Sequence, residues 1–201
     1  MERDSMSRQI AAEAARLVVE TGLELGPAKA RAARSLGRRA GARAELPGNE
    51  EVEAEVRAYI ELFCADTQPR ELAALREVAV SWMQRLQALR PHLAGAVWRG
   101  TATRQSAVHI DLYCDDAKAA ELMLLDLGID FDVDTLDAGG HQAQDVLTVS
   151  SLSRELGEAV TVHLFVRDFD DLRGALRPDA QGRTWRGDLA GVRRLLQQEA
   201  T

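Results

Sequence analysis

The chain has 201 residues, enough for one large or two small domains with a substantial core. It is 46% hydrophobic and 28% charged, and it contains no run of eighteen apolar residues and no apolar signal segment, so we expect a cytoplasmic protein that does not contact membranes. The net charge of −7 argues against bulk nucleic-acid binding, and Cys64 and Cys114 lack the spacing of metal ligands.

The first half of the chain is predicted to be helical, because its apolar residues recur at spacings of three and four. Gly22 is expected to end the first helix and Asn49 to cap the third, whose first turn is acidic. The predicted helices cover residues 7–22, 27–37, 50–65 and 69–89.

From His92 onward the apolar period changes to two, which predicts strands. The predicted strands cover residues 92–97, 107–114, 130–136, 145–151 and 159–168. Helices are expected over residues 116–128, 168–176 and 187–200, the last of them capped by Asp188. Helices followed by a mixed sheet predict an α+β protein, with a helical N-terminal region over 1–90 and an α+β domain over 91–201.

One stretch carries a family resemblance. The sequence AGAVWRGTATRQSAVHIDL, in residues 94–112, resembles the signature of the nucleotidyltransferase fold of the DNA polymerase β superfamily, in a degenerate form found in uncharacterised bacterial proteins. That signature has a glycine-serine pair, often Arg-Gly-Thr-Ala, and then Ser-Asp-apolar-Asp before a strand. The resemblance implies a phosphate-binding set of Gly95, Arg99, Gly100, Thr101 and Ser106.

The resemblance also implies a two-metal phosphoryl-transfer site, but the acids it requires are absent. In the family, aspartates at alternate positions of a strand and a third acid on a neighbouring strand hold two Mg²⁺ ions. Here Ala107 and His109 occupy the aspartate positions, Ala96 replaces the serine, and the neighbouring strand offers Thr161 or His163. Alanine has no ligand atom and imidazole is a poor ligand for Mg²⁺.

His109 and Asp111 are two residues apart, so their side chains point to the same face of the strand predicted over 107–114. His163 lies on the strand predicted over 159–168 and joins them if the two strands are neighbours. Three interpretations are open. The residues are packing groups that bond to one another, or they retain an acid/base or ligand role with Asp111 and His109 as catalytic residues, or His109, Asp111 and His163 bind a softer metal such as Zn²⁺ or Fe²⁺.

A basic stretch in the helical half also has two interpretations. Clustered cations can contact a nucleic-acid backbone, but without interleaved aromatic residues a solvated helix face is favoured. The residues concerned are Lys29, Arg31, Arg34, Arg38, Arg39 and Arg43.

The functional hypothesis is a nucleotidyltransferase-like pseudoenzyme that binds a nucleotide or a partner without efficient catalysis. One alternative is an active nucleotidyltransferase that modifies a protein, RNA or small molecule and uses a nucleotide with Mg²⁺ or another divalent metal. A second is a docking or oligomerisation protein, with a protein partner or a homodimer formed through the helical half and an unused cleft.

Overall fold

A computed structural model describes residues 2–37, 46–136 and 144–199. Its contacts divide the chain into two compact units. The helical unit contains the residues up to Pro69 together with Thr101–Ser106, and the sheet unit contains Arg70–Gly100 and the residues from Ala107 onward. These units are groups of residues in contact and do not define independently folding domains. The domain boundary at residue 90 therefore stays a prediction. No helix in the described ranges is long and apolar enough to cross a membrane.

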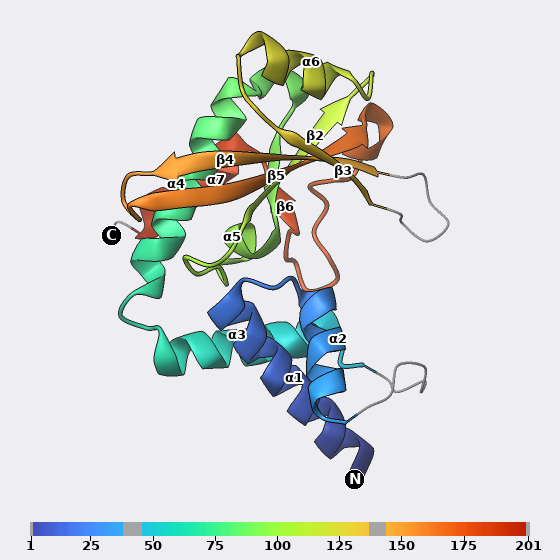
Figure 1. Ribbon diagram of the computed structural model, residues 1–201, viewed down its shortest axis with the longest axis vertical. Helices are drawn as coiled ribbons and strands as arrows, with labels where there is room; N and C mark the ends of the chain where they lie inside the picture. Colours follow the sequence, from blue (N-terminus) through green and yellow to red (C-terminus); the bar gives the residue numbers. More distant parts are fainter. Residues whose placement is uncertain (1, 38–45, 137–143, 200–201) are drawn as a thin grey trace. The chain divides into compact units, whose positions relative to one another are not determined.

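The helical unit is built on α1 (Glu2–Thr21), α2 (Leu25–Ser35) and α3 (Asn49–Phe63), and α1 contacts both of the other helices (Figure 1). Most of the apolar residues that recur at helical spacing in α1 and α3 are buried, although Phe63 at the end of α3 is exposed, and this confirms the helical periodicity of this part of the chain. The side chains of this core that are almost fully buried include Ile10, Ala14, Ala28, Ala32, Val52 and Val56.

The start of α3 corrects the predicted cap. Gly48 is the N-cap residue, and its backbone N–H donates to Glu51 Oε2 at 3.2 Å. Asn49 is the first helical residue, and its Oδ1 accepts a hydrogen bond of 2.7 Å from Lys29 Nζ, which also donates to the carbonyl of Pro47 at 3.2 Å. Asn49 therefore ties α2 to α3 through its side chain instead of capping its own helix.

The segment Thr101–Ser106 packs within the helical unit although it lies far along the chain. Thr103 Oγ1 donates to the carbonyl of Val19 at 3.2 Å, and Gln68 Nε2 donates to the carbonyl of Ala102 at 2.9 Å. Gly22 ends α1 as expected, with φ +70°, and a Cβ there would lie only 2.0 Å from the carbonyl oxygen of Gln105. Glycine is required at this close approach.

The sheet unit contains one mixed sheet of six strands in the order β3-β4-β5-β2-β1-β6. The strands are β1 (His92–Ala94), β2 (Val108–Cys114), β3 (Asp132–Leu136), β4 (Gln144–Ser153), β5 (Glu158–Asp168) and β6 (Arg186–Gly187). β2 and β5 pair in parallel, and every other pair is antiparallel. The predicted α+β class is confirmed.

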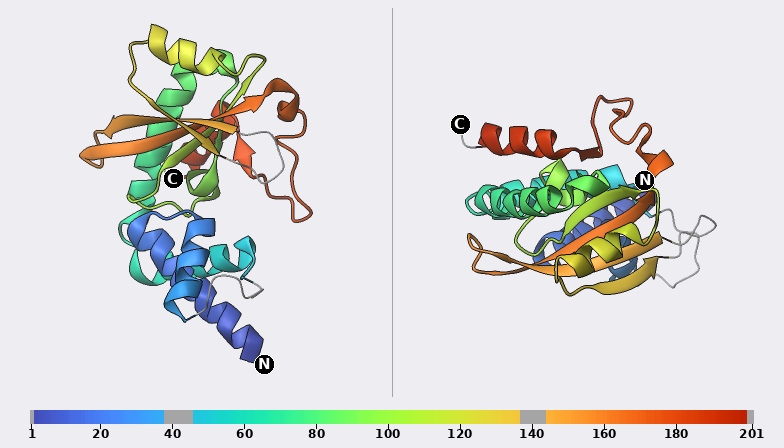
Figure 2. Two further views of the ribbon diagram at one scale, coloured as in Figure 1. Left: turned by 45° about the vertical axis from the view of Figure 1, so that its right-hand side comes forward. Right: turned by 90° about the horizontal axis from the view of Figure 1, so that it is seen from above.

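Helices lie around the sheet (Figure 2). They are α4 (Gln68–Arg85, which begins in the helical unit), α5 (Gly95–Arg99), α6 (Ala119–Asp126) and α7 (Leu189–Glu199), with short 3₁₀ turns at Gln87–Leu89 and Phe169–Leu172. Asp188 caps α7 as predicted, because its Oδ1 accepts from the N–H of Gly191 at 2.8 Å.

The strand predicted over 92–97 is present only in its first half. It stops at Ala94, and the chain turns at Gly95 into the short helix α5. The last turn of α5 is held by a buried cation, since Arg76 Nε donates to the carbonyl of Val97 at 3.1 Å and Arg76 Nη2 to that of Trp98 at 3.4 Å. A guanidinium that reaches the carbonyl end of a helix is favourable both for its hydrogen bonds and for the helix dipole.

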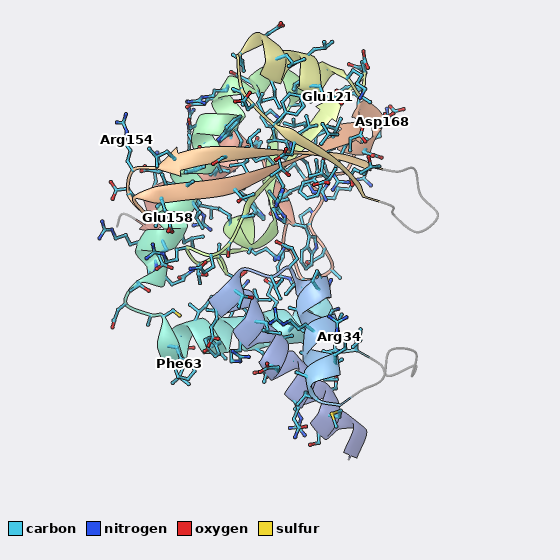
Figure 3. All side chains as sticks on the ribbon, viewed as in Figure 1. Arg34, Phe63, Glu121, Arg154, Glu158 and Asp168 are labelled. Carbon is cyan, nitrogen blue, oxygen red and sulfur yellow. The ribbon has the colours of Figure 1, made fainter. Side chains whose placement is uncertain are left out.

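The core of the sheet unit lies on the face formed by alternate residues of the central strands. Its fully buried side chains include Leu93, Val108, Ile110, Leu112, Val162 and Leu164. Side chains fill the space between this face and its helices, and the labelled Arg154 and Glu158 lie at the end of the β4–β5 hairpin (Figure 3).

Replacement of Gly22 by alanine is expected to destabilise the protein by about 1–3 kcal/mol, because the new side chain would combine a left-handed backbone with a clash against Gln105. Gly26→Ala is the matched control, since Gly26 lies in α2 with open space around it, and it should be neutral or stabilising by up to about 1 kcal/mol. Urea unfolding of both variants measures the difference. Equal stabilities would contradict the packing of Gln105 on α1.

Candidate functional site

The opposite face of the central strands is polar. In the parallel pairing of β2 with β5, His109 lies beside His163, Asp111 beside Phe165 and Tyr113 beside Arg167. We call these side chains, together with Arg186 on β6, the polar face. Alternate residues of a strand point to the same face, and residues paired in register on neighbouring strands share that face, so these side chains lie together on one face of the sheet. The two histidine-bearing strands are therefore neighbours, which was the condition for His163 to join His109 and Asp111.

Aromatic rings occupy one end of the polar face. The ring centroids of His109 and His163 are 5.4 Å apart, and those of His109 and Phe165 are 5.2 Å apart, both with edge-to-face geometry. His163 Nδ1 lies 3.0 Å from Thr148 Oγ1 on β4. These contacts make the two imidazoles part of a packed aromatic group, which is the first of the three interpretations of His109 and His163.

Asp111 lies in the middle of the polar face, between His109 and Tyr113 on β2, and belongs to a buried ion cluster. Asp111 is 1% exposed, and Arg167 Nε donates a hydrogen bond of 2.6 Å to Asp111 Oδ1. Arg186 Nη1 lies 3.3 Å from the other oxygen, Oδ2. A buried carboxylate needs such partners, because burial of an unpaired charge reduces the stability of the fold by roughly several kcal/mol. The two arginines come from β5 and β6, so the cluster joins three strands.

Tyr113 extends the ion cluster. Its hydroxyl accepts a hydrogen bond of 2.8 Å from Arg186 Nη1, and the edge of its ring meets His92 with centroids 5.2 Å apart. Burial, with the charge of Asp111 adding to it, raises the pKa of the Tyr113 phenol. Burial acts to lower the pKa of Arg186, but Asp111 and Tyr113 outweigh it and the net shift is upward. Both groups therefore keep their protons at neutral pH.

Gly95 lies directly against the ring of His109. Gly95 has φ +70°, and a Cβ placed on it would lie 3.1 Å from His109 Nδ1 and 3.3 Å from His109 Cγ. The first glycine of the motif therefore allows the chain to turn from β1 into α5 while an imidazole packs on its backbone. The space between this glycine and the strand is filled by the histidine that stands at an expected aspartate position.

The polar face does not suit the Mg²⁺ ions that the resemblance implies. Ala107 has no ligand atom, His109 packs among rings, and both oxygens of Asp111 already face guanidinium groups. Within the described residues there is no group of three His, Cys, Asp or Glu side chains placed to hold one metal ion. Asp111 faces Arg167 and Arg186 in this structure, and metal binding by His109, Asp111 and His163 stays a prediction.

The residues of the expected phosphate-binding set belong to both units. Gly95, Arg99 and Gly100 are in the sheet unit, whereas Thr101 and Ser106 are in the helical unit. Thr101 is buried at 4% exposure, and Ser106 Oγ accepts a hydrogen bond of 3.1 Å from the N–H of Thr103. The Ser106 hydroxyl thus stabilises its own turn. Phosphate binding by these five residues stays a prediction.

Trp185 sits beside Arg99, a contact that the sequence does not reveal. The Arg99 guanidinium carbon lies 5.8 Å from the centre of the Trp185 ring, and that of Arg183 lies 5.4 Å from it. Arg183 Nε donates a hydrogen bond of 3.0 Å to Asp179 Oδ2. Trp185 is 37% exposed, so this cluster combines an accessible aromatic surface with two cations.

The basic stretch is partly described. Lys29 is engaged with Pro47 and Asn49, while Arg31 and Arg34 are exposed on α2. Arg38, Arg39 and Arg43 lie outside the described residues. Nucleic-acid contact through this stretch stays a prediction.

Comparisons with known proteins found distant structural likeness alone. No family model matches the chain, and no curated protein matches it. The chain is similar to Cid1 in complex with its short product ApU, at 14% identity and a TM-score of 0.34 over 53% of this chain and 32% of that chain.

Two further structures are similar to the same degree. Cid1 poly(U) polymerase with MgGTP bound matches at 12% identity and a TM-score of 0.33, over 51% of this chain and 33% of that one. Cid1 with the UTP analogue UMPNPP matches at 12% identity and a TM-score of 0.35, over 57% and 36%. The matches span about a third of each Cid1 chain, and the likeness to this nucleotidyltransferase-fold enzyme is distant and partial.

Replacement of Asp111 by asparagine is expected to destabilise the protein by about 3–5 kcal/mol, because it leaves Arg167 and Arg186 partly buried without their counter-charge. Glu121→Gln is the control. It breaks the ion pair between Lys118 and Glu121 in the first turn of α6 and should cost about 0.5 kcal/mol or less. Denaturant unfolding monitored by circular dichroism compares the two. A cost for Asp111→Asn as small as the control would show that the cluster is not structural.

Proposed function

We propose that this protein is a nucleotidyltransferase-like domain that binds a nucleotide and has lost efficient Mg²⁺-dependent transfer. The single observation that carries the loss of transfer is the state of Asp111. It is the one acid in β2 between Val108 and Tyr113, and it is buried between Arg167 and Arg186. Oδ1 of Asp111 accepts a hydrogen bond from Arg167, and Oδ2, which accepts none among the described residues, faces Arg186 at 3.3 Å. The charge of this acid is therefore balanced by two internal cations, and a metal or an acceptor hydroxyl would have to displace an arginine to use it.

The packing of His109 supports the same proposal. Two-metal transfer needs carboxylates that converge on an open space where the reacting phosphate lies. Here the imidazole of His109 contacts Gly95 on one side and the rings of His163 and Phe165 on the other. A carboxylate is absent from this position, and the position itself is packed.

Nucleotide binding is supported by the chemistry around Trp185. An exposed indole offers a stacking surface to any base, and arginines beside it supply charge-assisted hydrogen bonds to phosphate. Arg99 is the link between this cluster and the motif of the sequence, because it closes α5, the helix that Gly95 begins. We therefore assign the base to Trp185 and a phosphate to Arg99.

A protein-binding role is the second candidate. Leu62 and Phe63, at the end of α3, are 73% and 65% exposed, and Phe63 stacks on Tyr59 with centroids 4.6 Å apart. Neighbouring exposed apolar side chains of this size are typical of contact surfaces. This observation supports docking of a protein partner through the helical unit, which is compatible with nucleotide binding by the sheet unit.

Incubation with labelled nucleoside triphosphates and Mg²⁺ is expected to give no transfer to the protein itself or to added RNA, and no release of pyrophosphate above the background without protein. The reason is that no carboxylate of β2 is open to a metal. Turnover that is abolished by an Asp111→Asn change in a variant that stays folded would overturn this expectation and support the active-enzyme alternative.

Replacement of Arg99 by glutamine is expected to weaken nucleoside triphosphate binding by about tenfold or more, because a charge-assisted hydrogen bond contributes roughly 1.5–3 kcal/mol. Calorimetric titration of each of the four triphosphates measures the affinity. Arg194→Gln, which removes an exposed arginine of α7, is the control and should bind as the unchanged protein does. Equal affinities in both variants, or no binding by the unchanged protein, would refute the assignment of Arg99.

A further inference from the structure

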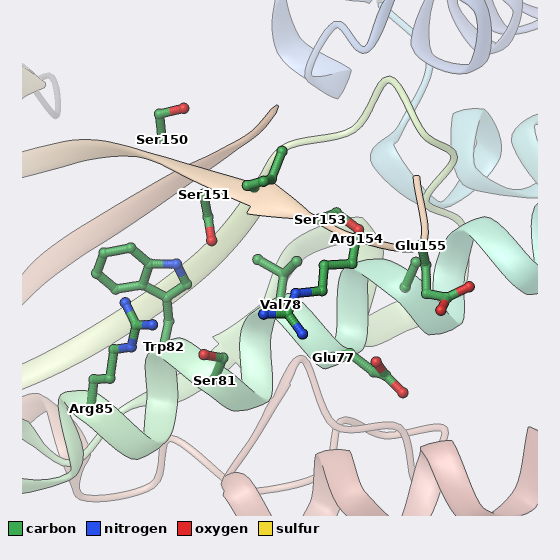
Figure 4. A pocket seen from close by; sticks show the side chains of 12 residues that line it. Glu77, Val78, Ser81, Trp82, Arg85, Ser150, Ser151, Ser153, Arg154 and Glu155 are labelled. Carbon is green, nitrogen blue, oxygen red and sulfur yellow. The ribbon is translucent and has the colours of Figure 1, made fainter. Parts of the chain in front are cut away.

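A groove lies between helix α4 and the end of the β4–β5 hairpin, within the sheet unit (Figure 4). Its cavity volume is about 590 Å³, within the range of small-molecule sites. The walls are one side of α4, from Ala74 to Arg85, and residues 150–155. Ser151 and Ser153 alternate with Thr148 along β4, so their side chains point to the face opposite the one that carries His163. The groove is separate from the polar face.

The groove contains a buried donor that the protein itself does not satisfy. Trp82 is only 2% exposed, and its Nε1 atom is buried with no hydrogen-bond partner among the described residues. A buried indole N–H nearly always has an acceptor, because its desolvation otherwise reduces the stability of the fold. Trp98, by contrast, donates its Nε1–H to the carbonyl of Thr184 at 2.8 Å. An acceptor from outside the chain fits the Trp82 N–H.

Other donors surround the same space. Figure 4 shows the indole of Trp82, the hydroxyls of Ser81 and Ser151 and the guanidinium of Arg154 directed into the groove from α4 and from the hairpin. Arg85 lies over the Trp82 ring, with its guanidinium carbon 5.4 Å from the centroid. The acids of the walls are placed differently, since Glu77 points away in Figure 4 and Glu155 pairs with Arg70 at 3.5 Å.

We propose that this groove binds the phosphate group of a small phosphorylated molecule. An indole N–H, two hydroxyls and a guanidinium are all hydrogen-bond donors, and they approach from different sides, which suits the several acceptor oxygens of a tetrahedral anion. The cavity is larger than a phosphate ion, so the remainder of the molecule lies along α4 beside Val78. The Trp82 N–H is the specific contact, and Arg154 supplies the opposite charge.

The test uses the full chain labelled with ¹⁵N and follows the indole N–H signals of its three tryptophans by NMR during titration with inorganic phosphate and then with glycerol phosphate. Trp82→Phe assigns the Trp82 signal. We expect saturable movement of this signal with both phosphates, tighter for glycerol phosphate, while the Trp98 signal stays in place. Sodium chloride at equal ionic strength and citrate are expected to leave the Trp82 signal unchanged.

Arg154→Gln is expected to weaken phosphate binding in this titration by about tenfold, since it removes a charge-assisted contact. Arg194→Gln, an equal change of charge outside the groove, should leave it unchanged. The Trp82 signal reports this groove alone, so a failure of nucleotide binding at Arg99 does not affect the result. No movement with phosphate, equal movement with chloride or citrate, or full affinity in Arg154→Gln would overturn the proposal.

Discussion

The buried carboxylate of Asp111 is the constraint on which the sheet unit depends. It needs two cations at once, and they come from opposite sides in the strand order, Arg167 from β5 and Arg186 from β6. β6 has only two residues and pairs with β1 through Leu93 and Ala94. Hydrogen bonding of so short a strand is weak, and the ion cluster with Tyr113 gives the segment around Arg186 a defined position.

The same cluster explains why the motif and the site disagree. The backbone pattern of the motif, with a glycine turn before a strand, is used for packing, because Gly95 accommodates the ring of His109. The acid of the strand is used to balance arginines. At the positions where the signature that the sequence resembles has acids, Ala107 and His109 stand here, and the imidazole of His109 packs among rings.

Much of the fold could be predicted from the sequence, since β2, β4 and β5 follow the alternation of apolar residues and α1, α3 and α4 follow the helical period. The short helix α5 could not, because the apolar residues from Ala96 to Trp98 follow those of β1 without a break in the sequence, and only the positive φ of Gly95 redirects the chain. The convergence of His109 with His163 was open to prediction from strand alternation. The partners of Asp111 were not, because Arg167 is one of many arginines and Arg186 lies on a strand too short to leave a pattern.

The order in which the partners of Asp111 occur along the chain has a consequence for synthesis on the ribosome. Arg167 follows Asp111 by 56 residues, and Arg186 comes later still. At about 5–20 residues per second, several seconds pass before both cations have been made. During that interval β2 cannot be buried without an uncompensated charge, and its parallel pairing with β5 must also wait. The sheet of the nascent protein therefore closes late, when its last two strands emerge, and until then its apolar strands are exposed to chaperones and to one another.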